Sequence, residues 1–172
     1  GLTYSGVNIV VTGEYPKDAE AIIIELVSIE NENILATKLE KKGTMRREKN
    51  NYTVQQMPIV YQFASDIDLN NYVENNNHQF GIHYLKQKFV FSNYSIYNEM
   101  DHDDIFEAII NLKNESKHYK LDMLELVKDD NNMFEAKFSL PAVPINGGCV
   151  LKVYTSVLNE LIESDNIEII FI

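Results

Sequence analysis

The sequence predicts an all-β protein built of two tandem antiparallel β-sandwich modules, residues 1–98 and 99–172. Three observations lead to this prediction. Short stretches with alternating apolar and polar residues follow one another along the chain of 172 residues, and clusters of asparagine, glycine and proline separate them. The pattern of the first half also recurs in the second: Phe63, Ile67, Leu69, Phe80 and Ile82 correspond, at one constant spacing, to Phe134, Phe138, Leu140, Leu151 and Val153.

In the first module, two segments give the clearest strand patterns. Over residues 7–12, Val7, Ile9 and Val11 alternate with Asn8, Val10 and Thr12, which predicts a half-buried strand. Residues 21–29 form a continuous run rich in β-branched side chains, which favours a strand that is covered on both faces. The remaining strands expected in this module are residues 34–39, 61–69 and 80–84, and the stretches 89–91 and 94–97 close it.

In the second module, two segments fit both a strand and a helix. Residues 101–113 begin with acidic side chains, as the first turn of a helix does, but their apolar residues alternate as in a strand. Residues 150–162 also place apolar side chains along one face of a helix. The repeat favours a strand over 101–113 and another through about Tyr154, and a mixed α+β fold with one or two short helices is the alternative. The other strands expected here are residues 119–126, 134–140 and 167–172.

The composition argues against several classes of function. The formal net charge of −11 opposes non-specific binding to nucleic acid or anionic lipid, since both need a basic surface. No run of about eighteen apolar residues is present, so we expect no membrane span. The single cysteine, Cys149, excludes an internal disulfide framework and a multi-cysteine metal site. Because nucleotide-binding and catalytic motifs are absent from the sequence, we expect no cofactor, no metal and no enzymatic activity.

Positive charge is concentrated in one segment, which we expect to be a loop inserted in the first module. Six of the 15 lysine and arginine residues lie there: Lys38, Lys41, Lys42, Arg46, Arg47 and Lys49. A basic loop of this kind can contact the phosphates of an anionic polymer, to which arginine offers two parallel hydrogen bonds. The alternative is a solvated loop without a ligand.

Two tyrosines, Tyr94 and Tyr97, are the other candidates for polymer binding. An exposed tyrosine ring can stack on the apolar face of a sugar ring, as aromatic side chains do in carbohydrate-binding modules. The alternative is that both rings pack against the strands and direct their hydroxyl groups to water.

Two further groups of residues could carry chemistry, and a structural role is favoured for each. A thiol at the start of a helix has a lowered pKa, which would make Cys149 a nucleophile with a histidine as its base. The repeat places Cys149 at the start of a strand instead, where this effect is absent. The acidic residues at positions 99–104 could bind a hard cation, but they lack the spacing of a calcium-binding loop.

The repeated pattern also resembles a known family. An apolar strand ends in Glu25-Leu26-Val27, a basic connection follows, and Phe63-Ala64-Ser65-Asp66-Ile67-Asp68-Leu69 and Phe80-Gly81-Ile82 come next, with an echo from Leu121 to Val153. This arrangement resembles the accessory immunoglobulin-like β-sandwich domains, often in tandem, of Gram-positive wall teichoic acid glycosyltransferases. The resemblance implies a non-catalytic part of a larger glycosyltransferase at the cytoplasmic face of the bacterium, with roles in trimer formation and in holding the polyol-phosphate polymer.

The sequence thus predicts a non-catalytic module that oligomerises and positions an anionic cell-surface polysaccharide for a glycosyltransferase. A structural or adhesive spacer of a surface or phage protein is the alternative. We expect a homo-oligomer because residues 167–172 place large apolar side chains on both faces of a terminal strand.

Overall fold

The computed structural model describes residues 6–43, 45–68, 80–91, 99–141, 148–158, 160–164 and 168–171. Most of these residues lie in β-strands, so the predicted all-β class is confirmed. The described residues also form two helices, α1 (Ile82–Lys88) and α2 (Glu99–Glu115), which the α+β alternative allowed for.

The main sheet contains eight strands. Their bounds are β1 (Val7–Glu14), β2 (Ala21–Ser28), β5 (Tyr61–Ser65), β7 (Tyr119–Lys128), β8 (Met133–Leu140), β9 (Cys149–Val157), β10 (Glu160–Ser164) and β11 (Glu168–Phe171). Across the sheet the order is β10-β9-β2-β5-β7-β8-β1-β11. Neighbouring strands are antiparallel except for β5 and β7, which run parallel.

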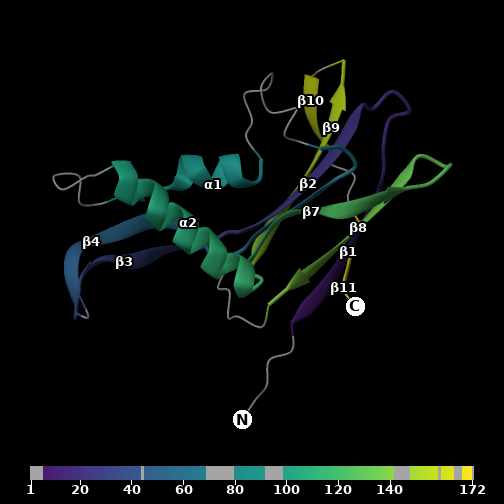
Figure 1. Ribbon diagram of the computed structural model, residues 1–172. Helices are drawn as coiled ribbons and strands as arrows, with labels where there is room; N and C mark the ends of the chain where they lie inside the picture. The colour runs from purple at the N-terminus through teal and green to yellow at the C-terminus, as the bar shows by residue number, and fades with distance from the viewer. Residues whose placement is uncertain are drawn as a thin grey trace, which may run out of the picture.

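A second sheet has three strands, β3 (Asn31–Lys42), β4 (Met45–Pro58) and β6 (Val90–Phe91), in the order β3-β4-β6. Both helices lie on the side of the molecule from which β3 and β4 extend (Figure 1). The helices and the small sheet therefore cover one side of the main sheet together.

Strands from the two expected modules are mixed within the main sheet. From the first segment, residues 1–98, β2 pairs with β9 and β1 pairs with β8, and both partners belong to the second segment, residues 99–172. The two segments thus share one sheet in the described part of the chain, and its strand order does not divide at residue 98.

Strand β2 is buried on both faces, as its continuous apolar run predicts. Every residue from Ala21 to Leu26 is at most 3% exposed. One face of β2 belongs to a core made with β1, β8 and β9, although β1 and β8 are not its neighbours in the sheet; the main sheet therefore curls. This inner core contains Ile9, Val11, Ile22, Ile24, Leu26, Ala64, Leu126, Phe134, Ala136, Phe138 and Val153.

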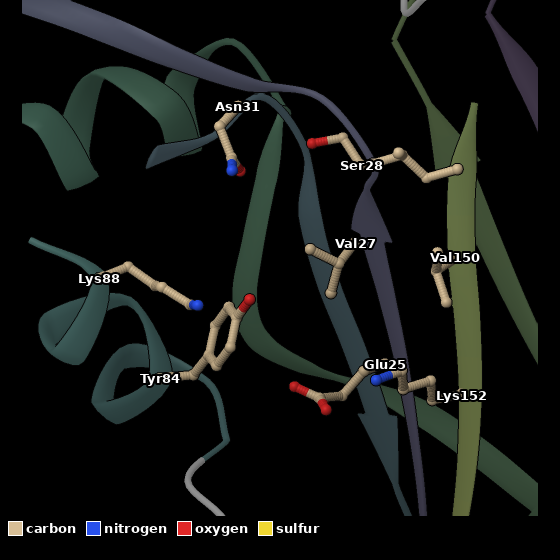
Figure 2. A pocket seen from close by; sticks show the side chains of 9 residues that line it. Glu25, Val27, Ser28, Asn31, Tyr84, Lys88, Val150 and Lys152 are labelled. Atoms are coloured by element: carbon tan, nitrogen blue, oxygen red, sulfur yellow. The ribbon is translucent and has the colours of Figure 1, made fainter. Parts of the chain in front are cut away.

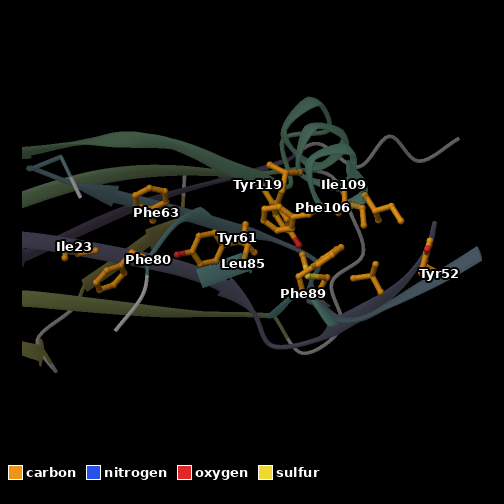
Figure 3. Close-up of a cluster of buried hydrophobic side chains, with 14 of the residues drawn as sticks. Ile23, Tyr52, Tyr61, Phe63, Phe80, Leu85, Phe89, Phe106, Ile109 and Tyr119 are labelled. Carbon is orange, nitrogen blue, oxygen red and sulfur yellow. The ribbon is translucent and has the colours of Figure 1, made fainter. Parts of the chain in front are cut away.

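The other face of β2 contributes to an outer core beneath the helices and the small sheet. Fully burying one large apolar side chain contributes about 1.5–3 kcal/mol relative to exposing it, so this cluster fixes the helices firmly. Figure 3 shows aromatic rings from the main sheet, from β4 and from α2 meeting in it. Its largest members are Tyr52, Tyr61, Phe63, Phe80, Phe89, Phe106, Tyr119 and Tyr154.

The prediction of a strand over residues 101–113 is wrong, because this segment lies in helix α2. Ile105, Phe106, Ile109 and Ile110 are buried at helical spacing, whereas Leu112 is 62% exposed. The apparent alternation arose because two exposed apolar residues of the helix, Ala108 and Leu112, lie two positions from the buried Ile110. The acidic start was the correct signal.

The strand expected at residues 80–84 is also wrong, because Ile82–Lys88 forms helix α1. Gly81 precedes the helix with a φ of +63°, a left-handed conformation that glycine adopts readily and that redirects the chain after Phe80. In contrast, the strand expected through Tyr154 is confirmed by β9, and β10 continues the strand structure from residue 160.

The basic segment is a β-hairpin, which corrects its prediction as a loop. The β3 and β4 backbones stay paired through Lys41 and Arg46 to the turn, where Gly43 has a φ of +62°. Backbone hydrogen bonds pair such a ribbon whatever its side chains are, so a polar sequence does not reveal it by alternation.

Helix α2 is docked onto this hairpin by buried polar contacts. The Tyr52 hydroxyl on β4 donates a hydrogen bond of 2.8 Å to the Asp101 carboxylate, and both residues are buried. Lys113, in the last turn, forms an ion pair with Glu32 of β3. Since burying a charge without a partner is costly, these contacts fix the direction in which the hairpin leaves the main sheet.

Candidate functional site

A pocket of about 330 Å³ lies where the main sheet, helix α1 and the start of β3 meet. Its volume falls at the lower end of the range of small-ligand sites, so it suits one small molecule or one unit of a polymer. Figure 2 shows that side chains from these elements converge on it. It is lined by Glu25, Val27, Ser28, Ile29, Asn31, Tyr84, Lys88, Val150 and Lys152.

Cross-strand pairs of β2 and β9 build the sheet side of the pocket. Glu25 is opposite Lys152, and Val27 is opposite Val150. Residues directly opposite each other in an antiparallel pair project to the same face, so the two pairs form a charged and an apolar patch side by side. A ligand on this surface meets apolar side chains at one end and charged side chains at the other.

Glu25 is a buried carboxylate held by a hydrogen-bonded relay. Its exposed fraction is 3%, and its Oε2 accepts a hydrogen bond of 2.6 Å from the Tyr61 hydroxyl. That hydroxyl in turn accepts a hydrogen bond of 2.8 Å from the backbone N–H of Gly81. The relay connects the sheet to the residue before α1, so the position of the helix and that of the carboxylate are coupled.

The helix side of the pocket is formed by Tyr84 and Lys88, one helical turn apart on α1. The Tyr84 ring stacks on the Tyr61 ring at 4.9 Å, and the Lys88 ammonium lies 5.6 Å from the centre of the Tyr84 ring. Burial and the negative charge of Glu25 raise the pKa of both tyrosines. Both hydroxyls therefore stay protonated at neutral pH and can donate hydrogen bonds.

The turn from β2 to β3 closes the remaining side and is fixed by its own hydrogen bonds. The Ser28 hydroxyl donates to the Glu30 carbonyl at 3.0 Å and accepts from the Val60 N–H at 3.1 Å. The Ile29 N–H donates to the Gly148 carbonyl at 3.0 Å. This turn holds Asn31, whose amide points into the pocket in Figure 2.

The charges around the pocket favour a ligand with an anionic group. Lys88 and Lys152 are both exposed, and within the described ranges neither forms an ion pair. Glu25 is the carboxylate of the lining, so lysines outnumber acidic groups there. An anion is expected at the lysines, where charge-assisted hydrogen bonds are strong, while hydroxyl or amine groups of the same ligand suit Glu25 and Asn31.

The residues predicted from the sequence to bind a polymer lie elsewhere. Lys38, Lys41 and Lys42 are on β3, Arg46, Arg47 and Lys49 are on β4, and none of them lines the pocket. The register places Lys41 opposite Arg46, so the hairpin brings at least these two basic residues together. Tyr94 and Tyr97 lie outside the described residues.

The other candidate groups have structural surroundings. Cys149 is the first residue of β9, as the repeat predicts, and burial raises the pKa of its thiol, which disfavours the nucleophilic thiolate. Asp101 binds the Tyr52 hydroxyl. In the part of the chain that the structure describes, no group of three metal-ligating side chains comes together.

The sequence reasoning missed the pocket residues, although one signal was present. Glu25 is the one charged residue in the otherwise apolar and small-residue run of β2. A charge in a strand that is covered on both faces needs a partner or a function, because burying it alone is expensive. Tyr84, Lys88 and Lys152 gave no comparable signal, since exposed lysines and half-buried tyrosines are common.

Fold and pocket together describe an all-β protein with a candidate ligand site beneath a short helix. Over residues 1–170 the chain matches the model of the family described as "Putative transmembrane protein (Alph_Pro_TM)", and it belongs to that family. No curated protein and no solved structure matches the chain. Among the helices of the described ranges, none has the length and apolar character needed to cross a bilayer.

Proposed function

We propose that this chain is a non-catalytic binding and assembly module that holds one unit of an anionic saccharide in the pocket. The observation that carries the proposal is the buried carboxylate of Glu25 facing a pocket whose other charged residues are Lys88 and Lys152. An anionic cell-surface polysaccharide is the source of such a unit that we favour, and a catalytic partner would act on it. The family description, a "Putative transmembrane protein", supports a role of this chain at a membrane.

A saccharide suits the pocket because it combines the three kinds of group that the lining can recognise. Its hydroxyls donate hydrogen bonds to a carboxylate such as Glu25, and its C–H face can lie on the apolar pair Val27 and Val150. A carboxylate or phosphate on the sugar would contact the lysines. A neutral sugar would leave the lysines without a ligand partner, and a purely cationic ligand would be repelled by them.

Assembly is proposed through the edge of the main sheet. Strand β11 lies at the end of the strand order, next to β1. An edge strand offers backbone hydrogen-bonding groups to a strand of another molecule. Analytical ultracentrifugation tests this part separately: a dimer or trimer is expected, and a monomer at high concentration would argue against it.

The binding proposal is tested by calorimetric titration with a matched pair of sugars, galacturonate and galactose, which differ in whether a carboxylate replaces a hydroxymethyl group. Galacturonate is expected to bind more tightly by roughly 10- to 100-fold, the contribution of one charge-assisted hydrogen bond. Lys152→Gln should remove most of this preference.

Lys137→Gln is the matched control, because Lys137 is an exposed lysine on β8 that does not line the pocket. The control removes the same charge from the molecule and should leave the preference for galacturonate unchanged. Equal binding of both sugars to the unmodified protein, or equal effects of the two substitutions, would show that the pocket does not recognise an anionic saccharide.

A further inference from the structure

One exposed face of β3 leads directly from the pocket to the basic end of the β3–β4 hairpin. Asn31 lines the pocket and is also the first residue of β3. Alternate residues after it, Asn33, Leu35 and Thr37, are all exposed, while the residues between them are half-buried. Because side chains two apart in a strand lie on one face, these four residues form a continuous strip that we call the β3 track.

The β3 track carries groups that suit a hydroxyl-rich chain. Thr37 donates a hydrogen bond of 2.9 Å to the Asn51 side chain on β4, so amide and hydroxyl groups lie beside each other at the surface. Leu35 is 73% exposed, an unusual position for a large apolar side chain, and it offers a contact for the C–H face of a sugar ring. The near half of the hairpin, residues 31–37 and 51–58, contains no lysine or arginine.

The basic residues begin where the β3 track ends. Lys38 follows Thr37 directly, and all six basic residues of the hairpin lie between it and Lys49. On the face of the β3 track the next basic position is Lys41, ten residues after Asn31 and about 33 Å along the strand at a rise of about 3.3 Å per residue. One sugar unit in the pocket therefore cannot reach the basic end, but a chain of several units can.

We propose that the ligand is an anionic polysaccharide whose terminal unit occupies the pocket and whose following units run along the β3 track to the basic end of the hairpin. This inference rests on the proposed function, and it identifies the ligand as a polymer and sets its direction. Two linked contacts on one chain raise the affinity because the second contact forms at a high effective concentration. The gain begins only when the chain spans the distance between them.

A length series tests this inference. The affinities of galacturonate oligomers, from the monomer to lengths beyond about 33 Å, are measured by calorimetry at two salt concentrations. Affinity is expected to change little among the shortest oligomers and then to rise on the order of 100-fold once the basic end is reached. Salt should weaken the long oligomers more than the monomer, because each additional ionic contact releases counterions.

Two variants separate the hairpin from the pocket. Replacing the cross-strand pair Lys41 and Arg46 by threonine should abolish the gain with length and leave the affinity of the monomer unchanged. Lys152→Gln should instead weaken the monomer and the long oligomers. The double variant Lys17→Gln with Lys137→Gln removes the same charge at exposed positions outside the hairpin and should retain the gain. Circular dichroism melting of each variant verifies that the fold is intact.

The outcomes distinguish this inference from the function on which it rests. Monomer binding without a gain in longer oligomers would overturn the inference and leave the proposed function standing. A gain that persists without Lys41 and Arg46, or equal binding of an oligothymidylate of the same charge, would also overturn it. If the monomer does not bind, the proposed function fails and this inference fails with it.

Discussion

The relay between Glu25, Tyr61 and Gly81 gives the sharpest prediction for stability. Tyr61→Phe keeps the ring and its stacking on Tyr84 but removes the hydroxyl that donates 2.6 Å to the Glu25 carboxylate and accepts 2.8 Å from the Gly81 N–H. A hydrogen bond to a charged group contributes about 1.5–3 kcal/mol and a neutral one about 0.5–1.5 kcal/mol. The variant is therefore expected to lose about 2–4 kcal/mol in its free energy of unfolding, measured by urea denaturation.

Two further tyrosine substitutions provide a graded control. Tyr119→Phe removes one buried hydrogen bond of 2.6 Å to the Pro58 carbonyl, so a loss of about 1 kcal/mol is expected. Tyr15→Phe removes an exposed contact of 3.4 Å and should change the stability by less than about 0.5 kcal/mol. A Tyr61→Phe variant that is no less stable than Tyr119→Phe would refute the reasoning, since the buried carboxylate would not then depend on its tyrosine partner.

Two more predictions concern the turn before α1 and alkaline stability. Gly81→Ala should destabilise more than Gly43→Ala in denaturation experiments: both have a φ near +60°, which is unfavourable for alanine, but Gly81 also has a ψ of −134°, outside the left-handed helical region, and only there would a Cβ meet the Phe63 ring at 3.1 Å. Equal losses would exclude the ring contact as a cause. Burial and nearby carboxylates raise the pKa of Tyr154 to about 12 from 10.0, so the unfolded chain releases this proton first. The contribution of the Tyr154 hydroxyl to the free energy of unfolding should be fully present below pH 10 and be lost as the pH rises towards 12. A denaturation midpoint that is constant over this range would contradict the raised pKa of Tyr154.

Local sequence patterns predicted a strand correctly where one face of the strand is buried and the other exposed, and where both faces are buried. Strand β8 alternates between buried and exposed residues from Phe134 to Phe138, and β2 is mostly apolar, with Glu25 as its one charged residue, because both its faces are covered. The first signal is the period-two alternation of a strand, and the second is the continuous apolar run of a strand buried on both faces; each predicted its strand correctly. The hairpin β3–β4 lacks such a signal in its basic half, where backbone pairing alone gives the strand.

The strand order could not be obtained from local patterns, and helix α2 was missed although its acidic start and helical spacing were local signals. The apparent repeat between Phe63 and Phe134 led to the prediction of strands in the second half of the chain, although α2 buries Ile105 and Ile109 at helical spacing. Strand order depends on contacts between residues far apart in sequence, such as β2 with β9, which periodicity does not encode. The pocket follows from that order, because Glu25 and Lys152 become neighbours only through it.

The central claim is that the pocket bounded by β2, β9 and α1 binds an anionic saccharide, and amide chemical-shift mapping by NMR tests it most directly. Titration with galacturonate should shift the amides of Glu25, Val27, Lys88 and Lys152 together, with one common dissociation constant. Galactose should produce smaller shifts at the same amides. Shifts confined to other parts of the chain, or none at these four residues at saturating galacturonate, would contradict the account.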